Sequence, residues 1–242
     1  MSEKRAKPII GTVFSRLYAR GRASSAKELL EAMGSKIRAV LFDMDGVLID
    51  AKDWHYEALN QALGLFGMEI SRYDHLHTFD GLPTKVKLQM LSEGQYLPVE
   101  LHDFIGELKQ AYTRDIVYQK CHPMFHHEYA LSKLHHAGYK IAVCSNSIRS
   151  TIDLMMDRAQ LTPYIDLILS NEDVTRSKPD PEMYLTAMQR FGLRPEECIV
   201  VEDNPKGIQA GRASGASVLE VATVYDVNYE NIMRQIGACE ND

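Results

Sequence analysis

The chain has 242 residues, 45% hydrophobic and 25% charged, values typical of a globular protein with one large domain or a domain with an insertion. Its net charge of −6 is uneven: the first 25 residues carry +5 and the remainder −11, which argues against nucleic acid as the main partner. No stretch approaches the ~20 apolar residues of a membrane span, so we expect no membrane partner either.

The first 25 residues are basic, with six Lys and Arg residues against the single acid Glu3. Such a segment is typical of an idle or oligomer-contacting arm, of a contact for an acidic partner, or of a transit peptide. We expect a basic arm over residues 1–25 in a monomer or homodimer. The four cysteines show no paired spacing, which predicts reduced thiols and a cytoplasmic protein.

The first regular elements are predicted directly after this arm. Ser25 to Glu28 fit a capping box and Gly34 a stop signal, which together predict a short helix at 26–33. The apolar run from Ile37 to Phe42 predicts a buried strand. This strand ends in the polar sequence Asp43-Met44-Asp45-Gly46.

Residues 53–121 change character, because apolar residues recur at helical spacing and no strand candidate interrupts them. The apolar positions are Trp54, Ala58, Leu59, Ala62, Leu63 and Phe66, then Val86, Met90 and Leu91, and finally Phe104, Leu108, Ala111 and Tyr112. An all-helical insertion after the first strand predicts a separate cap, with hinges near Ala51–Trp54 and Cys121–Met124.

From about residue 124 helical patterns alternate with short apolar runs. The predicted helices are Phe125–His136, Arg149–Gln160, Glu182–Phe191, Lys206–Ala213 and Tyr229–Ile236, and the predicted strands are Lys140–Cys144, Ile165–Leu169, Cys198–Val201 and Val218–Val221. This alternation implies right-handed crossovers and helices on both faces of a sheet. We predict an α/β fold: a doubly wound, Rossmann-like parallel sheet from residues 26–52 and 122–242, with an all-helical cap at 53–121.

Polar clusters follow three of the predicted strands: Asp43 to Gly46, Ser145-Asn146 and Glu202-Asp203. In an open parallel sheet, ligands bind just beyond the carboxyl ends of the strands. We therefore expect the three clusters to converge on one crevice. Their residue types predict a metal-assisted site that processes phosphate groups.

The two carboxylates of the first cluster can serve one substrate in different roles. Asp43 is positioned to attack phosphorus and give an aspartyl-phosphate, while Asp45 donates and then accepts the proton. Gly46 relieves steric demands where the chain turns toward the insertion. The alternative is a polar turn after a strand. A calcium loop is not favoured, because its later ligands are absent.

Glu202 and Asp203 place two acids at a buried strand end, where they repel each other and need a cation. Mg²⁺ prefers oxygen ligands and retains water and phosphate oxygens. We expect Asp43 and Asp203 as direct ligands, a backbone carbonyl near Asp45, and Glu202 close by or acting through water. Helix capping is the alternative for both acids, but the start signal Asn204-Pro205 leaves little need for two.

Three further residues are predicted to bind phosphate. Ser145 and Asn146 precede a helix, where a hydroxyl, an amide and free backbone N–H groups can hold a phosphoryl group. An ordinary N-cap explains this dipeptide equally well. Lys178 lies between Ser177 and two stiffening prolines, where a fixed cation can neutralise phosphate charge. A solvated loop lysine is the alternative.

In their order and spacing these residues resemble the haloacid dehalogenase-like hydrolase superfamily. The matching positions are Asp43 to Val47 for the first motif, Ser145 for the second, Lys178 for the third and Glu202-Asp203 for the acidic fourth. The resemblance covers about residues 37–225. Residues 178–184 and 202–207 are similar to the subgroup of β-phosphoglucomutase and of sugar-phosphate and phosphoglycolate phosphatases. The resemblance implies a helical cap, a Mg²⁺ cofactor and a small phosphorylated metabolite as substrate.

Asp45 and the cap guide the choice among the family's activities. Dehalogenases of the family lack a second acid two residues after the nucleophile, so Asp45 favours phosphoryl chemistry. Mutases similar to β-phosphoglucomutase hold a second phosphate with a basic cap loop, whereas Thr78–Thr84 here includes Asp80 instead of a cation. Lys85 and Lys87 are near enough to replace that charge but are interpreted as solvated. We expect a phosphatase, with a mutase or a non-catalytic phospho-ligand-binding protein as alternatives.

Clustered histidines are the remaining candidates for chemistry. They are His122, His126 and His127, followed by His135 and His136. No recognised zinc-ligand pattern accompanies them, which predicts residues on helix surfaces. His55 is a better candidate for a contact between cap and core, and Trp54 is expected to pack at the hinge.

Overall fold

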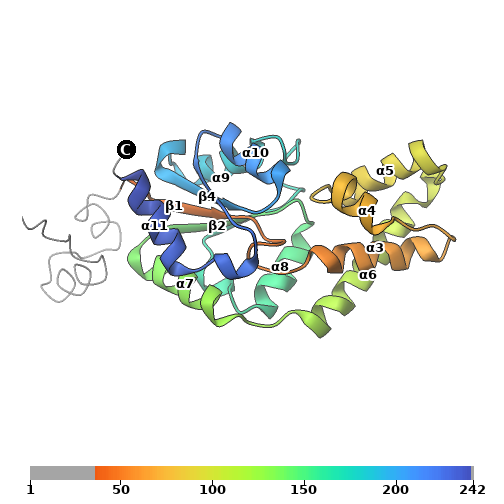
Figure 1. The fold of residues 1–242 in the computed structure, drawn as a ribbon, viewed down its shortest axis with the longest axis horizontal. Helices are drawn as coiled ribbons and strands as arrows, with labels where there is room; N and C mark the ends of the chain where they lie inside the picture. The colour runs from red at the N-terminus through yellow and green to blue at the C-terminus, as the bar shows by residue number, and fades with distance from the viewer. Residues whose placement is uncertain (1–35, 241–242) are drawn as a thin grey trace, which may run out of the picture.

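The computed structural model describes residues 36–240 and contains a five-stranded sheet with a helical lobe beyond one end of the strands (Figure 1). The strands are β1 (Ala39–Phe42), β2 (Lys140–Cys144), β3 (Leu167–Leu169), β4 (Cys198–Glu202) and β5 (Ser217–Glu220). All pairings are parallel and the order is β3-β2-β1-β4-β5, with β1 central. The predicted helix at 26–33 and the basic arm at 1–25 lie outside the described residues.

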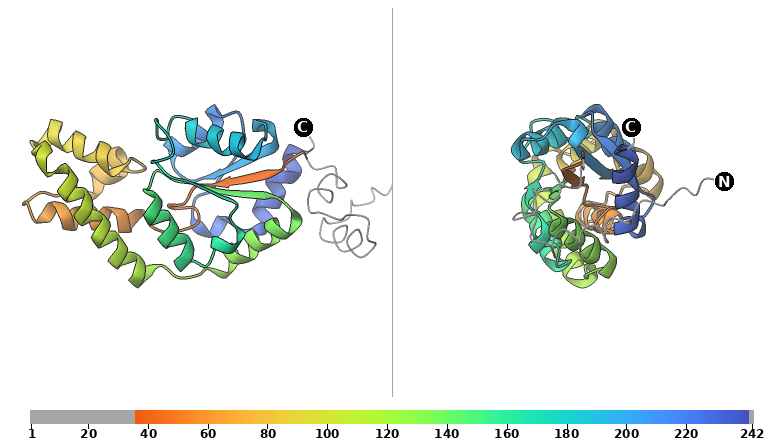
Figure 2. Two further views of the ribbon diagram at one scale, coloured as in Figure 1. Left: turned by 180° about the vertical axis from the view of Figure 1, so that it is seen from behind. Right: turned by 90° about the vertical axis from the view of Figure 1, so that its left-hand side faces the viewer.

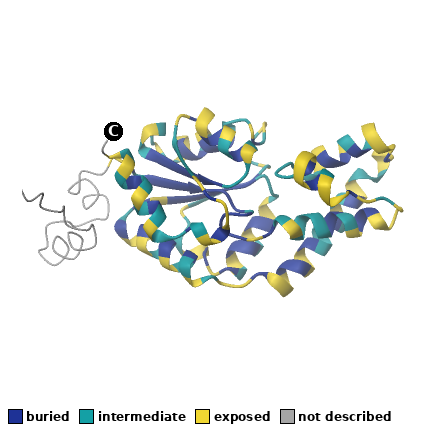
Figure 3. Ribbon diagram, viewed as in Figure 1, coloured by how far each residue is buried: buried dark blue, intermediate teal, exposed yellow. Residues whose placement is uncertain are grey.

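Helices cover both faces of the sheet (Figures 2 and 3). One face packs against α7 (Phe125–Ala137), α8 (Arg149–Arg158) and α11 (Tyr229–Cys239), and the other against α9 (Glu182–Phe191) and α10 (Pro205–Ala213). The side chains of β1 alternate between these layers: Val40 and Phe42 enter the first, Ala39 and Leu41 the second. The predicted doubly wound α/β fold is confirmed.

The predicted bounds of β2 and α9 coincide with those observed, and most others differ by one to three residues. Two strands begin two residues later than predicted: β1 at Ala39 instead of Ile37, and β3 at Leu167 instead of Ile165. The N–H of Ile165 still closes a 3₁₀ turn by donating to the carbonyl of Thr162 (3.3 Å). Ile165 is therefore unable to begin the ladder with β2.

Between β1 and α7 the described chain forms only helices and turns. They are α3 (Lys52–Gly64), α4 (Arg72–Asp74), a π-helical turn η1 (His75–Phe79), α5 (Thr84–Gln95), a 3₁₀ turn η2 (Val99–Leu101) and α6 (His102–Lys120). Their apolar side chains form a hydrophobic cluster of their own, separate from the clusters on the sheet. This lobe matches the predicted helical cap, while the exact domain boundaries remain a prediction.

In two helices of the cap, one residue of the predicted apolar pattern is exposed, while Leu91, Met90, Leu108 and Tyr112 belong to or pack against the cap's hydrophobic cluster. α5 buries Lys87, Leu88 and Leu91, whereas Val86 is 42% exposed. In α6 Phe104 is 52% exposed. Lys85 is exposed, as expected, but the interpretation of Lys87 as solvated is wrong. The reason is that α5 turns the face carrying Lys87 toward the rest of the molecule, where it lines a cleft.

The histidines near the second hinge do not all lie on the surface. His122, His135 and His136 are exposed, as predicted, but His127 is buried. Its Nε2 donates to the carbonyl of Val224 (2.8 Å). His127 thus ties α7 to the turn at Val224–Asp226. The four cysteines are free thiols and Trp54 packs against the main core, both as predicted.

The burial of His127 predicts a specific loss of stability in acid. Burial lowers the pKa of His127 to about 4, from an ordinary value of 6.5. Between these pH values the unfolded chain binds a proton that the folded chain does not, so stability is lost as pH falls from 6.5 toward 4. The expected loss is up to about 3 kcal/mol. Urea unfolding of the parent and of His127→Gln, measured across this range, tests the prediction.

In His127→Gln the amide can still donate to Val224 but does not titrate, so stability should fall less steeply with acid. His136→Gln changes an exposed histidine and is the matched control, with the slope of the parent. Equal slopes for all three proteins would contradict the role of His127.

Among the helices at residues 36–240, none is both long and apolar enough to cross a membrane.

Candidate active site

The polar clusters at the strand ends converge, as predicted, on one cleft between the sheet and the cap. Its volume is about 1450 Å³. The core residues that line it include Asp43, Asp45, Ser145, Asn146, Lys178 and Glu202. The cap contributes two buried lysines, Lys87 and Lys109, and two histidines, His55 and His75.

Lys178 lies at the centre of the core side of the cleft. Its Nζ donates to Asp43 Oδ1 (2.7 Å), to Glu202 Oε1 (2.7 Å) and to the carbonyl of Cys144 (2.8 Å). Although burial alone would lower it, the pKa of Lys178 is raised by the carboxylates of Asp43 and Glu202. Lys178 is 4% exposed, so the solvated-loop alternative is wrong and the side chain is a fixed cation beside Asp43.

Glu202 is held beneath the first turn of α10. Its Oε1 also accepts from the hydroxyl of Tyr184 (2.6 Å), and its Oε2 accepts from the N–H of Asp203 (3.2 Å). A Cβ at Gly207 would lie 1.8 Å from Oε1, so only glycine fits there. Asn204 is the N-cap of α10, accepting from the N–H of Lys206, so the side chain of Asn204 caps the helix.

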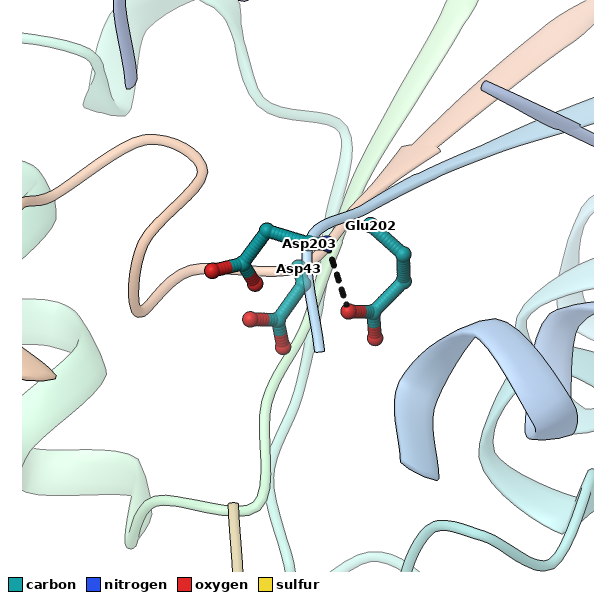
Figure 4. A group of neighbouring side chains, drawn as sticks. All are labelled: Asp43, Glu202 and Asp203. Atoms are coloured by element: carbon teal, nitrogen blue, oxygen red, sulfur yellow. Dashed lines mark hydrogen bonds between the residues drawn. The ribbon is translucent and has the colours of Figure 1, made fainter. Parts of the chain in front are cut away.

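Asp43, Glu202 and Asp203 form an acidic cluster whose oxygens lie within 4.8 Å of one another (Figure 4). The side chain of Asp203 is 2% exposed, and neither of its oxygens has a well-directed hydrogen bond among the described residues. Its one ion pair there is with Lys52 Nζ. A Cβ at Gly46 would lie 2.1 Å from Asp203 Oδ2, which explains glycine at this turn.

The charge of this cluster fits a divalent cation. Burial raises the pKa of Asp203 to about 6, and burial together with the Glu202 carboxylate raises the pKa of Asp43 well above its usual value. Burial is the main cause of both pKa shifts; the Glu202 carboxylate adds to the shift of Asp43, whereas Lys52 opposes that of Asp203. Three buried carboxylates this close together are hard oxygen ligands of the kind that a divalent cation such as Mg²⁺ takes.

The Asp45 carboxylate is turned away from the acidic cluster and toward the cap. Its Oδ1 accepts from His55 Nε2 (3.0 Å) and its Oδ2 from Ser147 Oγ (3.2 Å). Because Nε2 donates to a carboxylate, Nδ1 of His55 is the acceptor for Lys109 Nζ (3.0 Å). The predicted contact between His55 and the core is confirmed. Asp45 is not part of the three-carboxylate group, and its backbone carbonyl remains the predicted metal contact.

These contacts set the ionisation of the residues around Asp45. Although burial alone would raise it, the pKa of Asp45 is lowered by His55 and Lys109. Burial, together with the charge of Lys87, lowers the pKa of Lys109 to about 7. Asp45 is therefore an ionised carboxylate in the resting site, oriented by a chain of two cap residues.

Ser145 and Asn146 lie at the predicted place but are not helix caps. The N-cap of α8 is Ile148, so the ordinary N-cap interpretation is wrong. Ser145 is buried and its Oγ accepts from the N–H of Ser147 (3.1 Å). Asn146 accepts from the N–H of Lys178 (3.2 Å) and donates to the carbonyl of Gly81 in the cap (2.9 Å).

Asp80 binds the cap loop, residues 78–84, to the core. Its Oδ2 accepts from Asn204 Nδ2 (2.7 Å), and its carbonyl accepts from Lys206 Nζ (2.7 Å). Together with the bond from Asn146 to Gly81, these contacts hold residues 78–84 against the strand ends. An acid at this position of the loop thus serves as a contact to the core.

Several residues of the site were not found from the sequence: Lys52, Lys87, Lys109, Ser147 and Tyr184. One signal for Lys109 is present, because it lies four residues after Ile105 and four before Thr113 on the buried face of α6. A lysine within such a face is unusual and marks a polar neighbourhood. Lys87 lies close to the cap loop Thr78–Thr84, and Tyr184 ends the stretch 178–184 that resembles the subgroup, so each of these has a signal. Lys52 and Ser147 carry no comparable signal in the sequence.

The ion pair between Lys52 and Asp203 predicts an effect on metal binding. Lys52 competes with a cation for one carboxylate, so Lys52→Met should bind Mg²⁺ more tightly, by roughly 2- to 5-fold for a partly exposed pair. Calorimetry or the fluorescence of Trp54, the single tryptophan of the chain, measures this without turnover. Lys120→Met removes a surface ion pair with Glu57 and should leave the affinity unchanged. Weaker binding by Lys52→Met would show that Lys52 assists the metal instead.

Comparisons with known proteins agree with this site. A family model described as haloacid dehalogenase-like hydrolase matches residues 40–221. The fructose-1-phosphate phosphatase YqaB of Escherichia coli is 28% identical over 191 residues, 78% of this chain and 98% of that protein. The phosphorylated carbohydrates phosphatase of Thermotoga maritima is 26% identical over 205 residues, 84% of this chain and 92% of that protein.

Solved structures show the same fold. The crystal structure of β-phosphoglucomutase from Clostridium difficile has a TM-score of 0.73 at 21% identity and covers 84% of this chain and 98% of that chain. CbbY from Rhodobacter sphaeroides, solved in complex with phosphate, has a TM-score of 0.68 at 20% identity, with 75% and 84% covered. With its family model, its motifs and its fold in agreement, this chain belongs to the haloacid dehalogenase-like hydrolases.

Proposed function

We propose that this haloacid dehalogenase-like phosphatase uses Mg²⁺ to hydrolyse a small phosphorylated metabolite through an aspartyl-phosphate on Asp43. The observation that carries the proposal is the pairing of two carboxylates with opposite surroundings. Asp43 lies among buried acids and the cation of Lys178, while Asp45, two residues on, is held by His55. One is placed for nucleophilic attack and the other for proton transfer.

In the first step an oxygen of Asp43 attacks phosphorus in line with the leaving alcohol. Lys178 Nζ and Ser145 stabilise charge on the equatorial oxygens, with Asn146 nearby. Mg²⁺, held by Asp43 and Asp203 with Glu202 beside them, would supply further neutralisation of the phosphoryl group. Asp45 is ionised in the resting site, so it takes up a proton from solvent when the substrate binds; it gives this proton to the leaving oxygen and becomes again the carboxylate that His55 stabilises.

In the second step the same carboxylate of Asp45 takes a proton from water, which attacks the phosphorus of the aspartyl-phosphate. This releases inorganic phosphate and restores Asp43. The contacts of Asp80 and Gly81 with the core keep the cap closed over the cleft. Closure excludes bulk water during the first step, and opening lets the products leave.

A mutase is the second candidate, because the cap offers two buried lysines facing the cleft. Buried cations in the cap give a second phosphate a place to bind, although Thr78–Thr84 lacks the basic residues expected there.

A cytoplasmic location is part of our proposal, since four free thiols fit a reducing compartment.

Phosphate release tests the proposed function. The purified protein is incubated with sugar phosphates, polyol phosphates, phosphoglycolate and nucleotides, with Mg²⁺ or with a chelator. We expect release from at least one small phosphomonoester with Mg²⁺ and none with the chelator. Conversion of a hexose 1-phosphate in the presence of a bisphosphate primer, without net release, would establish the mutase instead. Binding of phosphorylated compounds without either reaction would establish a non-catalytic protein.

A further inference from the structure

Lys87 is a buried cation that the protein itself does not neutralise. It lies in the first turn of α5, is 7% exposed and lines the cleft. Its ammonium has no hydrogen bond and no ion pair among residues 36–240. Burying a charge without a partner is costly, so such residues are rarely retained without a ligand to pair with.

The neighbouring acids are already engaged elsewhere. Asp80 accepts from Asn204, and Asp45 accepts from His55 and Ser147. Burial lowers the pKa of Lys87 to about 8, and the fields of Asp80 and Asp45 only partly oppose this shift. At neutral pH the side chain of Lys87 is therefore positively charged, and the neighbouring acids do not neutralise it fully.

Other cationic or neutral donors surround the same part of the cleft. Lys109 is buried in α6, and the charge of Lys87 lowers its pKa, so the two ammonium groups act on each other. Lys206 acts on Lys87 from the core side. His75 Nε2 is buried without a hydrogen-bond partner in the described part of the chain. The cap side of the cleft also carries the acids Glu93, Asp103 and Glu107, but none of them forms an ion pair or a hydrogen bond with Lys87 or Lys109 among residues 36–240.

The position of Lys87 relative to the reacting groups defines what it can bind. The phosphoryl group occupies the core side of the cleft, at Asp43 and Lys178, and the leaving oxygen lies at Asp45. Asp45 faces the cap through His55 and Lys109. The part of the substrate that leaves as an alcohol therefore extends toward the wall formed by α5 and α6, where Lys87 lies.

We propose that Lys87, supported by Lys109, is an anion subsite that binds a second acidic group of the substrate. The substrate class is then a phosphomonoester whose alcohol carries a carboxylate or a second phosphate. This inference rests on the proposed function, because it places the scissile phosphate at Asp43. Lys87 would then determine which substrates are preferred, whereas residues of the core carry out the chemical steps.

Matched pairs of substrates test the subsite. Phosphoglycolate is compared with 2-hydroxyethyl phosphate, and fructose 1,6-bisphosphate with fructose 1-phosphate, so that each pair differs in one acidic group. We expect the acidic member to have the higher kcat/KM in at least one pair, and the pair that responds identifies carboxylate or phosphate. In Lys87→Met this preference should fall by about 10- to 100-fold, while the rate with the neutral member stays within about 3-fold.

Lys133→Met is the matched control, because it removes the same charge from an exposed position on α7 that does not line the cleft. It should keep the preference of the parent. Lys87→Met should also melt at a higher temperature than the parent, since it removes an unpaired buried charge. No preference in the parent, an equal loss on both members of a pair, or a lower melting temperature for Lys87→Met would each overturn the subsite.

A binding measurement separates this inference from the proposed function. Calorimetry with Asp43→Asn, alone and combined with Lys87→Met, compares the affinity of phosphoglycolate with that of 2-hydroxyethyl phosphate, and likewise for the fructose pair. A preference for an acidic member that disappears with Lys87 supports the subsite even if the parent shows no turnover. Turnover with no such preference in any pair leaves the phosphatase standing and removes the subsite.

Discussion

Asp43→Asn is expected to reduce Mg²⁺-dependent phosphate release by roughly 10⁴-fold or more, because an amide oxygen is too weak a nucleophile to attack phosphorus. The hydrogen bond with Lys178 is kept, since Oδ1 of an asparagine can still accept from Lys178. The substitution also removes one negative charge from the acidic cluster, so Mg²⁺ should bind more weakly. Initial rates at saturating Mg²⁺ separate the two effects.

Asp53→Asn is the matched control for this prediction. Asp53 lies in the first turn of α3 and its side chain is 65% exposed, with an ion pair to the likewise exposed Arg72. We expect its rate to equal that of the parent within about 2-fold, as for other surface changes. If Asp43→Asn retained a tenth or more of the parent rate at saturating metal, Asp43 would not be the nucleophile.

Asp45→Ala is expected to lose about 10²- to 10⁴-fold in turnover of alkyl phosphates, the usual contribution of general acid–base catalysis. It should bind Mg²⁺ nearly as well as the parent, because the Asp45 carboxylate faces His55 and Ser147 and lies outside the acidic cluster. A loss of turnover together with an unchanged Mg²⁺ affinity would show that Asp45 transfers a proton and does not bind the metal through its carboxylate. Rates and calorimetry on the same preparation measure both.

An aryl phosphate makes this prediction sharper. Its phenolate leaves without a proton, so the first step should survive in Asp45→Ala while hydrolysis of the aspartyl-phosphate does not. We expect a burst of about one phenolate per active site, followed by a slow steady rate. Unchanged turnover of alkyl phosphates would remove Asp45 from its role, and a tenfold loss of Mg²⁺ affinity would make its carboxylate a metal ligand.

The core and its carboxyl-end residues could be predicted from the sequence because both follow from local rules. Apolar runs such as Ile141–Cys144 form buried parallel strands, and a topological rule places their polar ends in one crevice. The convergence of Asp43, Ser145 and Glu202 on the cleft follows without knowledge of any loop. The contact between His55 and the core could be predicted from the position of His55 just beyond the first motif.

The cap side of the site could not be predicted, because it depends on how helices are rotated and packed. Lys109 meets His55 across 54 residues of chain, and α5 turns Lys87 inward while exposing Val86. Helical periodicity in α5 is too weak to choose between these faces, since apolar residues lie on both. Asn146 likewise follows a predicted strand, but its bond to Gly81 depends on the position of the cap loop.

Trapping the covalent intermediate tests the central claim most directly. Asp45→Ala is mixed with Mg²⁺ and an aryl phosphate, quenched in acid, and digested for mass spectrometry. The mechanism predicts one added phosphoryl group per chain, located on Asp43, and none when Asp43→Asn is combined with Asp45→Ala. A phosphoryl group on another residue, or a stoichiometric burst of phenolate with no phosphorylated peptide, would contradict the aspartyl-phosphate mechanism.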